Sequence, residues 1–267
     1  MSEATVLYEL QGNTALITLN RPNVLNAINL SLLKELLGAL YRAADDSAAS
    51  TVILTGAGRS FCAGEDLKES SEETDCEAFV KQAAMLQEVQ RSVMRLGKPL
   101  ICAVKGYAVG GGCEFAMSCD IRIAGASAVF GFPETEIGLT VTTAGTKLLS
   151  QLVGLGKAKE LIFTGAMIGS EEALRLGLVN KVAPDEDVVN EAMSMAKTIG
   201  KRSSLALKLS REAIDCGLHS GFEEILKLEE SHLLTCFLAG NFRVLTANKL
   251  RKLKDGSSLS REESKSF

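Results

Sequence analysis

The sequence predicts an α/β protein built around a parallel sheet. Short, continuously apolar runs such as residues 51–55 and 100–104 are typical of buried strands. Longer segments between them carry apolar residues at helical spacing, and this alternation is typical of βαβ construction. With 267 residues, the chain suits one α/β domain or one domain with an appendage.

The N-terminal elements are predicted to be a hairpin followed by a helix. Residues 5–10 and 14–19 read as two strands, and Gly12 lies in the turn between them. Residues 20–23 break the strand pattern. Residues 30–44 then place apolar side chains on one face of a helix, which precedes the strand at 51–55.

The middle of the chain alternates between polar and apolar character. Residues 68–77 are polar and acidic, so we expect a mobile loop there, of a kind that can also act as a lid. Residues 79–96 return to helical spacing, and Lys98-Pro99 ends that helix. The buried strand at 100–104 leads into a glycine-rich turn.

After Gly169 the chain becomes mainly helical. Ser170 and the two glutamates that follow it are typical of a helix start, and Gly177 is typical of a helix end. Three more helices are predicted at residues 187–199, 204–215 and 221–238. The basic cluster of Lys249, Arg251, Lys252 and Lys254 is interpreted as a solvated helix end, in preference to a phosphate contact.

Composition argues against several classes of function. The net charge of −4 gives no general attraction to nucleic acid or to an anionic membrane. The sequence has no apolar run of membrane-spanning length, no secretory signal pattern and no basic amphipathic presequence at its N-terminus. We therefore expect a cytoplasmic protein that neither binds nucleic acid nor inserts into a membrane.

The cysteines and histidines do not indicate a disulfide framework or a metal site. The seven cysteines are an odd number, are scattered, and form no C-x-x-C pair, so buried reduced thiols are expected. The two histidines, His219 and His232, have no cysteines near them and lie far from the glycine-rich turn. We expect neither a zinc site nor a Ser-His-Asp triad.

The segment 110–114, Gly-Gly-Gly-Cys-Glu, is the strongest indication of chemistry. Three consecutive glycines leave the backbone uncovered, and the helix-like run after them leaves free N–H groups at its start. Tight packing of a strand against a helix explains one glycine readily, but three in a row less well. N–H donors beside the carboxylate of Glu114 suit an acid–base enzyme that stabilises an anionic intermediate.

This segment belongs to a set of motifs that resembles the crotonase family, and within it the enoyl-CoA hydratases. The similarity runs from about Leu16 to Val182 as ordered blocks, at residues 19–22 with 25–27, 61–67, 98–99 with 106–114, 118–121, 130–134, and 164–165 with 173–179. The resemblance implies a spiral of ββα units with a C-terminal helical region that drives trimer formation. Residues 1–198 would form the spiral core with the active site, and residues 199–267 the helical oligomerisation region, giving a homotrimer or a dimer of trimers.

The resemblance also implies the chemistry of the site. Members bind acyl-CoA thioesters and stabilise an enolate oxyanion with two backbone N–H groups, which match those of Glu65 and Gly111. The two catalytic glutamates match Glu114, which would orient and deprotonate water, and Glu134, which would protonate Cα. Two carboxylates that hold one water can perform both steps without a metal, and a shared apolar pocket separates their pKa values. No cofactor is expected, since coenzyme A is part of the substrate.

Contacts with coenzyme A follow from the same resemblance. The pantetheine and phosphate region would be lined by Arg21, Asn23, Leu25 and Ala27. The adenine-side loop would contribute Ala63, Asp66, Leu67 and Lys68. The family often has a lysine where Asn23 stands, and Asp66 is favoured as a cap of the following helix over a substrate contact.

Two departures from the family pattern affect the acyl pocket. Glu65 is larger than the residue often found there, and its carboxylate must point away from the enolate. Residues 135–146 lack the usual Gly/Pro-rich turn and contain Val141-Thr142-Thr143, which leaves the preferred acyl group open. Glu136 is interpreted as an exposed or structural carboxylate.

Three alternatives to hydration stay open. Isomerisation of 3-enoyl thioesters or thioester hydrolysis would use the same oxyanion donors. Isomerases commonly keep only the second glutamate, so the presence of Glu114 favours hydration. A noncatalytic acyl-CoA-binding or RNA-binding protein is disfavoured by the acidic charge balance and by both glutamates.

Overall fold

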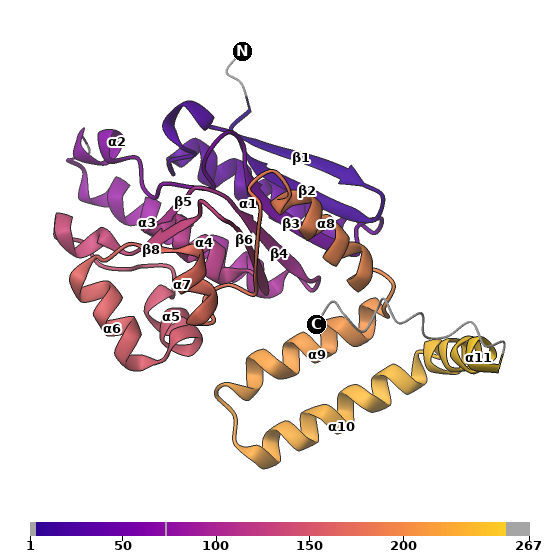
Figure 1. Cartoon of the computed structure of the whole chain (residues 1–267). Coiled ribbons are helices and arrows are strands. Elements are labelled where there is room, and N and C mark those ends of the chain that lie inside the picture. Colours follow the sequence, from indigo (N-terminus) through magenta and orange to yellow (C-terminus); the bar gives the residue numbers. More distant parts are fainter. Residues whose placement is uncertain (1–3, 73, 255–267) are drawn as a thin grey trace. The chain divides into compact units, whose positions relative to one another are not determined.

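The computed structural model describes residues 4–72 and 74–254 (Figure 1). The chain divides after Lys201 into two compact units. The first unit contains both β-sheets, and the second consists of helices.

The first unit has one large and one small sheet. The large sheet has the order β1 (Val6–Gln11), β2 (Thr14–Leu19), β3 (Thr51–Gly56), β4 (Leu100–Val104), β6 (Ile121–Gly125) and β9 (Lys181–Ala183). Its first two strands are antiparallel and all later pairs are parallel. The small sheet has the order β5 (Tyr107–Val109), β7 (Val129–Gly131) and β8 (Ile168–Gly169). The predicted N-terminal hairpin and the predicted parallel sheet are both confirmed.

The chain winds repeatedly from the large sheet to the small one. Strand β4 of the large sheet is followed by β5 of the small sheet and then by helix α4 (Gly111–Ser118). Strand β6 is likewise followed by β7 and by the short 3₁₀ turn η2 (Pro133–Ile137). Because β5 pairs in parallel with β7, and Val109 lies opposite Gly131, α4 and η2 begin side by side.

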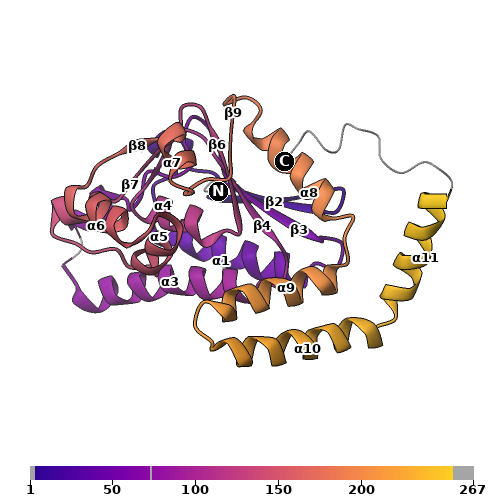
Figure 2. The ribbon, with the colours of Figure 1, turned by 60° about the horizontal axis from the view of Figure 1, so that its bottom comes forward.

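Helices cover both faces of the large sheet, which explains its continuously apolar strands. Helix α8 (Val188–Ile199) packs against one face through Val188, Ala192 and Ala196 (Figure 2). On the other face, α1 (Leu30–Asp45) and α3 (Cys76–Arg95) join the main core. All six residues of β3 are buried as a result.

The expectation of a loop at residues 68–77 is wrong for most of its length. Helix α2 (Leu67–Glu72) occupies its first part, and α3 begins at Cys76. The Asp75 side chain caps α3 by accepting a hydrogen bond from the N–H of Glu77 at 2.9 Å. Lysine and glutamate are good helix formers, and acidic side chains are favourable in a first helical turn, so a polar segment can be helical here.

The remaining helices of the first unit are α5 (Gly145–Val153), α6 (Leu155–Thr164) and α7 (Ser170–Arg175), with a 3₁₀ turn η1 at Pro22–Val24. The second unit contains α9 (Ser204–Gly217), α10 (Phe222–Leu238) and α11 (Asn241–Lys254). The helices predicted at 204–215 and 221–238 are thus confirmed. Within residues 4–72 and 74–254, none of the helices combines the length and the apolar character that a bilayer crossing needs.

Candidate active site

The structure requires glycine at two of the three consecutive positions, for different reasons. Gly110 has a left-handed backbone with φ of 54°, which favours glycine. A Cβ on Gly112 would collide with the carbonyl oxygen of Cys62, so this glycine allows the helix to pack on the neighbouring backbone. At Gly111 a Cβ would meet only the end of the Ile28 side chain, at 2.9 Å. Packing therefore explains one glycine of the three, as the sequence suggested.

The backbone of residues 62–65 runs beside the end of β5. The N–H of Cys62 donates to the Tyr107 carbonyl at 2.8 Å, and the Cys62 carbonyl accepts from the N–H of Val109 at 3.1 Å. Gly64 has a φ of 92°, and a Cβ there would lie 2.8 Å from the Val109 oxygen. This close approach brings the chain around Glu65 to the start of α4.

The peptide groups of Glu65 face away from the strand that flanks it. Ile28 donates its N–H to the Gly64 carbonyl at 2.8 Å, and its own carbonyl accepts from the N–H of Asp66 at 2.9 Å. In such a parallel bridge, the residue between the two bonded peptides directs its N–H to the other side. Gly111 is the first residue of α4, where an N–H has no acceptor within its own helix. Both Glu65 and Gly111 line one cavity.

This cavity has a volume of about 460 Å³ and a wall that is largely apolar. Many of its apolar side chains come from α2, α3, the end of η2 and the segment after it, and these are Leu67, Phe79, Ala83, Leu86, Ile137 and Leu139. The other apolar lining residues are Ile28, Ala63, Val109 and Pro133. Four carboxylates also line it, those of Glu65, Glu114, Glu134 and Glu136. The structure therefore brings the two predicted glutamates and the two predicted N–H donors to one place.

Glu114 is buried and its carboxylate is held by backbone donors. It lies in the first turn of α4 and is 2% exposed. Its Oε1 accepts hydrogen bonds from the N–H of Thr142 at 3.1 Å and of Thr143 at 2.5 Å. Burial raises the pKa of Glu114 to about 7, with a further contribution from Glu134, while the backbone N–H groups act in the opposite direction.

Glu134 lines the same cavity and is less buried than Glu114. It is the second residue of η2, and its Oε1 would lie 3.2 Å from a Cβ on Gly110. Both of its carboxylate oxygens are buried, and neither has a hydrogen-bond partner among the residues that the structure describes. Burial raises the pKa of Glu134, the residue's own backbone N–H acts in the opposite direction, and the nearby charge of Glu65 adds to the rise.

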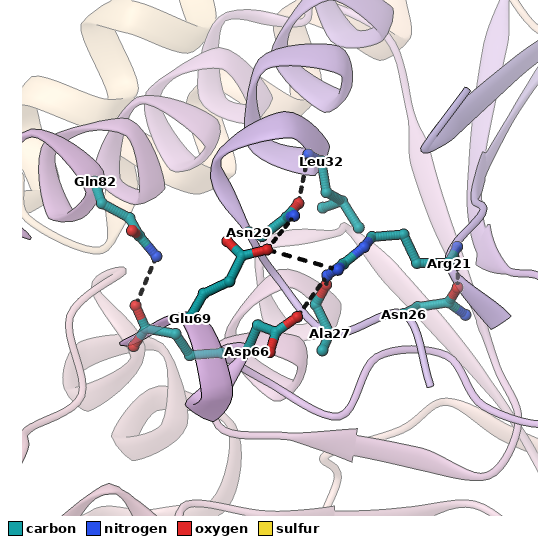
Figure 3. A network of polar contacts seen from close by, with 9 residues as sticks. Arg21, Asn26, Ala27, Asn29, Leu32, Asp66, Glu69 and Gln82 are labelled. Atoms are coloured by element: carbon teal, nitrogen blue, oxygen red, sulfur yellow. Dashed lines mark hydrogen bonds and ion pairs between the residues drawn. The ribbon is translucent and has the colours of Figure 1, made fainter. Parts of the chain in front are cut away.

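The side chain of Glu65 is held by the two helices of the cavity wall. Its Oε1 accepts a hydrogen bond from Nε2 of Gln82 on α3 at 2.8 Å (Figure 3). A hydrogen bond with the Ser70 hydroxyl on α2 lowers the pKa of Glu65, but burial outweighs it and raises that pKa. Glu65 therefore presents its N–H to the cavity while its carboxylate is bonded to α2 and α3.

Three of the residues predicted to contact coenzyme A, Arg21, Ala27 and Asp66, belong to a polar network beside the cavity (Figure 3). Arg21 donates from Nη1 to the Ala27 carbonyl at 2.5 Å and to Oδ2 of Asp66 at 3.0 Å. Its Nη2 lies 3.8 Å from Oε1 of Glu69. Asp66 thus forms an ion pair with Arg21 from the position directly before α2, and its role as a cap of that helix stays a prediction.

The other predicted coenzyme A residues lie around this network. Asn23, Leu67 and Lys68 are exposed, and Leu25 and Ala63 are half-buried. Ala63 and Leu67 also line the cavity. Their contacts with coenzyme A stay a prediction.

The sequence analysis did not predict the groups that hydrogen-bond to the carboxylates of Glu114 and Glu65. Thr142 and Thr143 were singled out only because they depart from the family pattern, yet their N–H groups bind Glu114. A signal was present, because residues just before a helix have N–H groups without intrahelical acceptors, and α5 begins at Gly145. The sequence holds no comparable signal for the contact between Gln82 and Glu65, which lie 17 positions apart.

Comparisons with known proteins agree with this geometry. The family model for enoyl-CoA hydratase/isomerase matches residues 9–242. The short-chain-enoyl-CoA hydratase of Clostridium acetobutylicum is 45% identical over 87% of this chain and 89% of its own length. The crotonyl-CoA hydratase of Syntrophomonas wolfei is 38% identical over 89% of this chain and 91% of its own.

Solved structures of enoyl-CoA hydratases and related proteins have a similar fold. The crystal structure of an enoyl-CoA hydratase from Bacillus anthracis has a TM-score of 0.88 and 33% identity, covering 94% of this chain and 96% of that one. DspI from Pseudomonas aeruginosa has a TM-score of 0.89 and 30% identity, with the same coverage of both chains. The predicted α/β fold of the crotonase type is thereby confirmed. With its sheets, its cavity and these relatives in agreement, the chain belongs to the enoyl-CoA hydratase/isomerase family.

Proposed function

We propose that this protein is an enoyl-CoA hydratase, which adds water across the 2,3 double bond of a 2-enoyl-CoA thioester. The observation that carries the proposal is the pairing of Glu114 and Glu134 in one cavity, the first held by backbone donors and the second without a partner among the described residues. The names of the relatives from Clostridium acetobutylicum and Syntrophomonas wolfei support the same activity.

The thioester oxygen would accept hydrogen bonds from the N–H groups of Glu65 and Gly111. Addition of hydroxide at Cβ places negative charge on this oxygen, so the donors bind the enolate more strongly than the substrate. The N-terminus of α4 adds favourable electrostatic potential at Gly111. One such donor is typically worth roughly 3–4 kcal/mol of barrier lowering.

The two carboxylates would supply the acid–base chemistry. Glu114 orients a water molecule and takes one of its protons while the oxygen bonds to Cβ. Glu134 gives a proton to Cα, because its burial favours the protonated form. Glu114 ends protonated and Glu134 ends ionised, and a proton exchange between them restores the starting state. Both groups lie in one cavity, so water adds to one face of the double bond.

The remaining parts of the chain would serve binding and assembly. Arg21, Asn23, Leu25 and Ala27, with Ala63, Asp66, Leu67 and Lys68, would contact the coenzyme A portion of the substrate, and no further cofactor takes part. The second unit would form a homotrimer or a dimer of trimers. Its support is the large apolar surface on α10, where Phe222 is 80% exposed, Leu233 72% and Leu238 73%.

A spectrophotometric screen of enoyl-CoA thioesters tests the activity. We expect short, unbranched 2-enoyl-CoA substrates such as crotonyl-CoA to lose the absorbance of their conjugated thioester. The same screen with 3-enoyl-CoA substrates separates hydration from isomerisation, which would instead increase that absorbance. If no 2-enoyl-CoA of any chain length is turned over, the proposal is wrong.

A further inference from the structure

The ionisable side chains that line the cavity are all acidic. Glu65, Glu114, Glu134 and Glu136 contribute four carboxyl groups, and no lysine, arginine or histidine lies among the described residues of the wall. The rest of the lining is apolar side chains, backbone, and the two hydroxyl-bearing residues Thr140 and Thr142. An anion in this space would therefore meet no cationic partner from the cavity wall.

Basic groups close to the cavity are already engaged or point elsewhere. The guanidinium of Arg21 is paired with Asp66 at 3.0 Å and approached by Glu69 at 3.8 Å. Lys68 follows the lining residue Leu67, but its side chain is exposed. Neither side chain belongs to the cavity wall.

A negatively charged acyl group would be unfavourable in such a place for two reasons. It would lose its hydration without gaining an ion pair, and a buried charge without a partner is costly. It would also lie near carboxylates of the same sign, and such like-charge juxtaposition in a binding site opposes association. The raised pKa values of Glu65, Glu114 and Glu134 show that the cavity already disfavours negative charge.

Building on the proposed function, we propose that the cavity selects against 2-enoyl-CoA thioesters whose acyl group ends in a carboxylate, and that Glu65 is the specificity-determining side chain. Glu114 and Glu134 are committed to the reaction, which leaves two further acids. The carboxylate of Glu65 is half-buried and tied to Gln82 and Ser70, so it is fixed near the cavity. Glu136 also lines the cavity, but its side chain is exposed and its Oε1 lies close to Gly165, which is not a lining residue.

The test compares two thioesters that differ in charge and hardly in shape. Glutaconyl-CoA carries a terminal carboxylate, and its amide, 5-amino-5-oxopent-2-enoyl-CoA, is a neutral isostere, while crotonyl-CoA serves as the reference substrate. We expect kcat/KM for glutaconyl-CoA to be about 100-fold lower than for the amide, which corresponds to about 2.8 kcal/mol of opposed charge. Values within about threefold of each other would overturn the proposal.

Glu65→Gln isolates the contribution of the side chain. An amide at this position can keep the hydrogen bonds to Gln82 and Ser70, so the substitution removes the charge and little else. We expect Glu65→Gln to lower the ratio of kcat/KM for the amide to kcat/KM for glutaconyl-CoA by about tenfold. The matched control Glu136→Gln should lower the same ratio by less than about twofold. Equal ratios in Glu65→Gln and wild type, or a larger change in Glu136→Gln, would overturn the assignment to Glu65.

A binding measurement separates this inference from the proposed activity. Calorimetric titration of the full chain with glutaryl-CoA and with its neutral amide does not depend on turnover. We expect the amide to bind about 100-fold more tightly than glutaryl-CoA. This expectation holds even if the protein does not hydrate crotonyl-CoA, in which case the proposed function would be wrong. Equal affinities in a protein that hydrates crotonyl-CoA would overturn the charge selection and leave the proposed function standing.

Discussion

Glu114 and Glu134 line the same cavity, yet the protein holds them in opposite ways. Glu114 comes from α4, and its Oε1 accepts two backbone N–H groups from the segment before α5. Glu134 comes from η2, and its two buried oxygens have no partner among the described residues. Burial raises the pKa of both, and N–H groups of other residues counteract it at Glu114, whereas at Glu134 only the residue's own N–H does so.

The difference shows how one cavity can prepare two acids for different tasks. A carboxylate fixed by N–H donors has a set orientation and a partly ionised state near neutral pH, as a base that positions water requires. A buried carboxyl group without donors is more easily kept protonated, as a proton donor requires. The contrast therefore matches the proposed roles, and four measurements can break or sharpen it.

The largest expected effect is on turnover of crotonyl-CoA. Glu114→Gln and Glu134→Gln should each lower kcat by a factor of about 10² to 10⁴, the usual contribution of a general acid or base. The isosteric amides keep size and polarity, so folding and binding of coenzyme A should be retained, as circular dichroism and calorimetry can check. Near-wild-type rates in both variants would contradict the mechanism.

The second-largest expected effect is a loss of stability with rising pH, caused by Glu114. The folded protein raises the pKa of Glu114 from the ordinary 4.5 to about 7, so it keeps a proton that the unfolded chain releases. Stability from this group is fully present below pH 4.5 and is lost as pH rises to about 7, with a total on the order of 3 kcal/mol. Denaturant unfolding between pH 4.5 and 8 should show this fall in wild type and a smaller one in Glu114→Gln. If wild type and Glu114→Gln showed the same dependence of stability on pH, a group other than Glu114 would be responsible for it.

Truncation of the two acids should affect stability unequally. Glu114→Ala leaves the N–H groups of Thr142 and Thr143 without their acceptor, which costs about 1–3 kcal/mol. Glu134→Ala removes a buried group that has no hydrogen bond to another described residue, so its unfolding free energy should equal or exceed that of wild type at pH 7. Denaturant unfolding of the two variants measures the difference, and the reverse order would mean that Glu134 has a partner in solution.

The smallest expected effect concerns the loop that holds Glu114. Ala144 lies between the two donors and α5 with a φ of 59°, a conformation that is strained for any residue with a Cβ. Ala144→Gly should therefore stabilise the protein by up to about 1 kcal/mol, seen as a rise in melting temperature of a few degrees. A lower melting temperature would contradict this expectation. It would show that the greater freedom of glycine in the unfolded chain destabilises the variant more than relief of the backbone strain stabilises it.

Much of the fold could be predicted because its elements have strong local patterns. The hairpin around Gly12, the helix at 30–44 and the buried strands at 51–55 and 100–104 all lie where periodicity places them. The prediction of a loop at residues 68–77 was wrong because a polar composition without apolar periodicity is typical of loops. Its helices depend on capping by Asp75 and on exposed glutamates, and these leave no apolar periodicity.

The site could be predicted in part for a similar reason. Glu65, Gly111, Glu114 and Glu134 were found through family motifs, and the structure brings them to one cavity. Their supporting contacts depend on pairs distant in sequence, such as Arg21 with Asp66 and Gln82 with Glu65. Such pairs have no local signature, because packing of separate elements brings them together.

The register of the small sheet has a consequence for protein engineering. Val109 lies opposite Gly131, so Gly111 is two residues beyond this pair on one strand and Glu134 three residues beyond it on the other. An insertion at Ser127, before β7 begins, leaves that count intact. A single-residue deletion at Phe132 changes the count, and it would shift Glu134, the proposed proton donor, relative to Gly111, the proposed oxyanion donor.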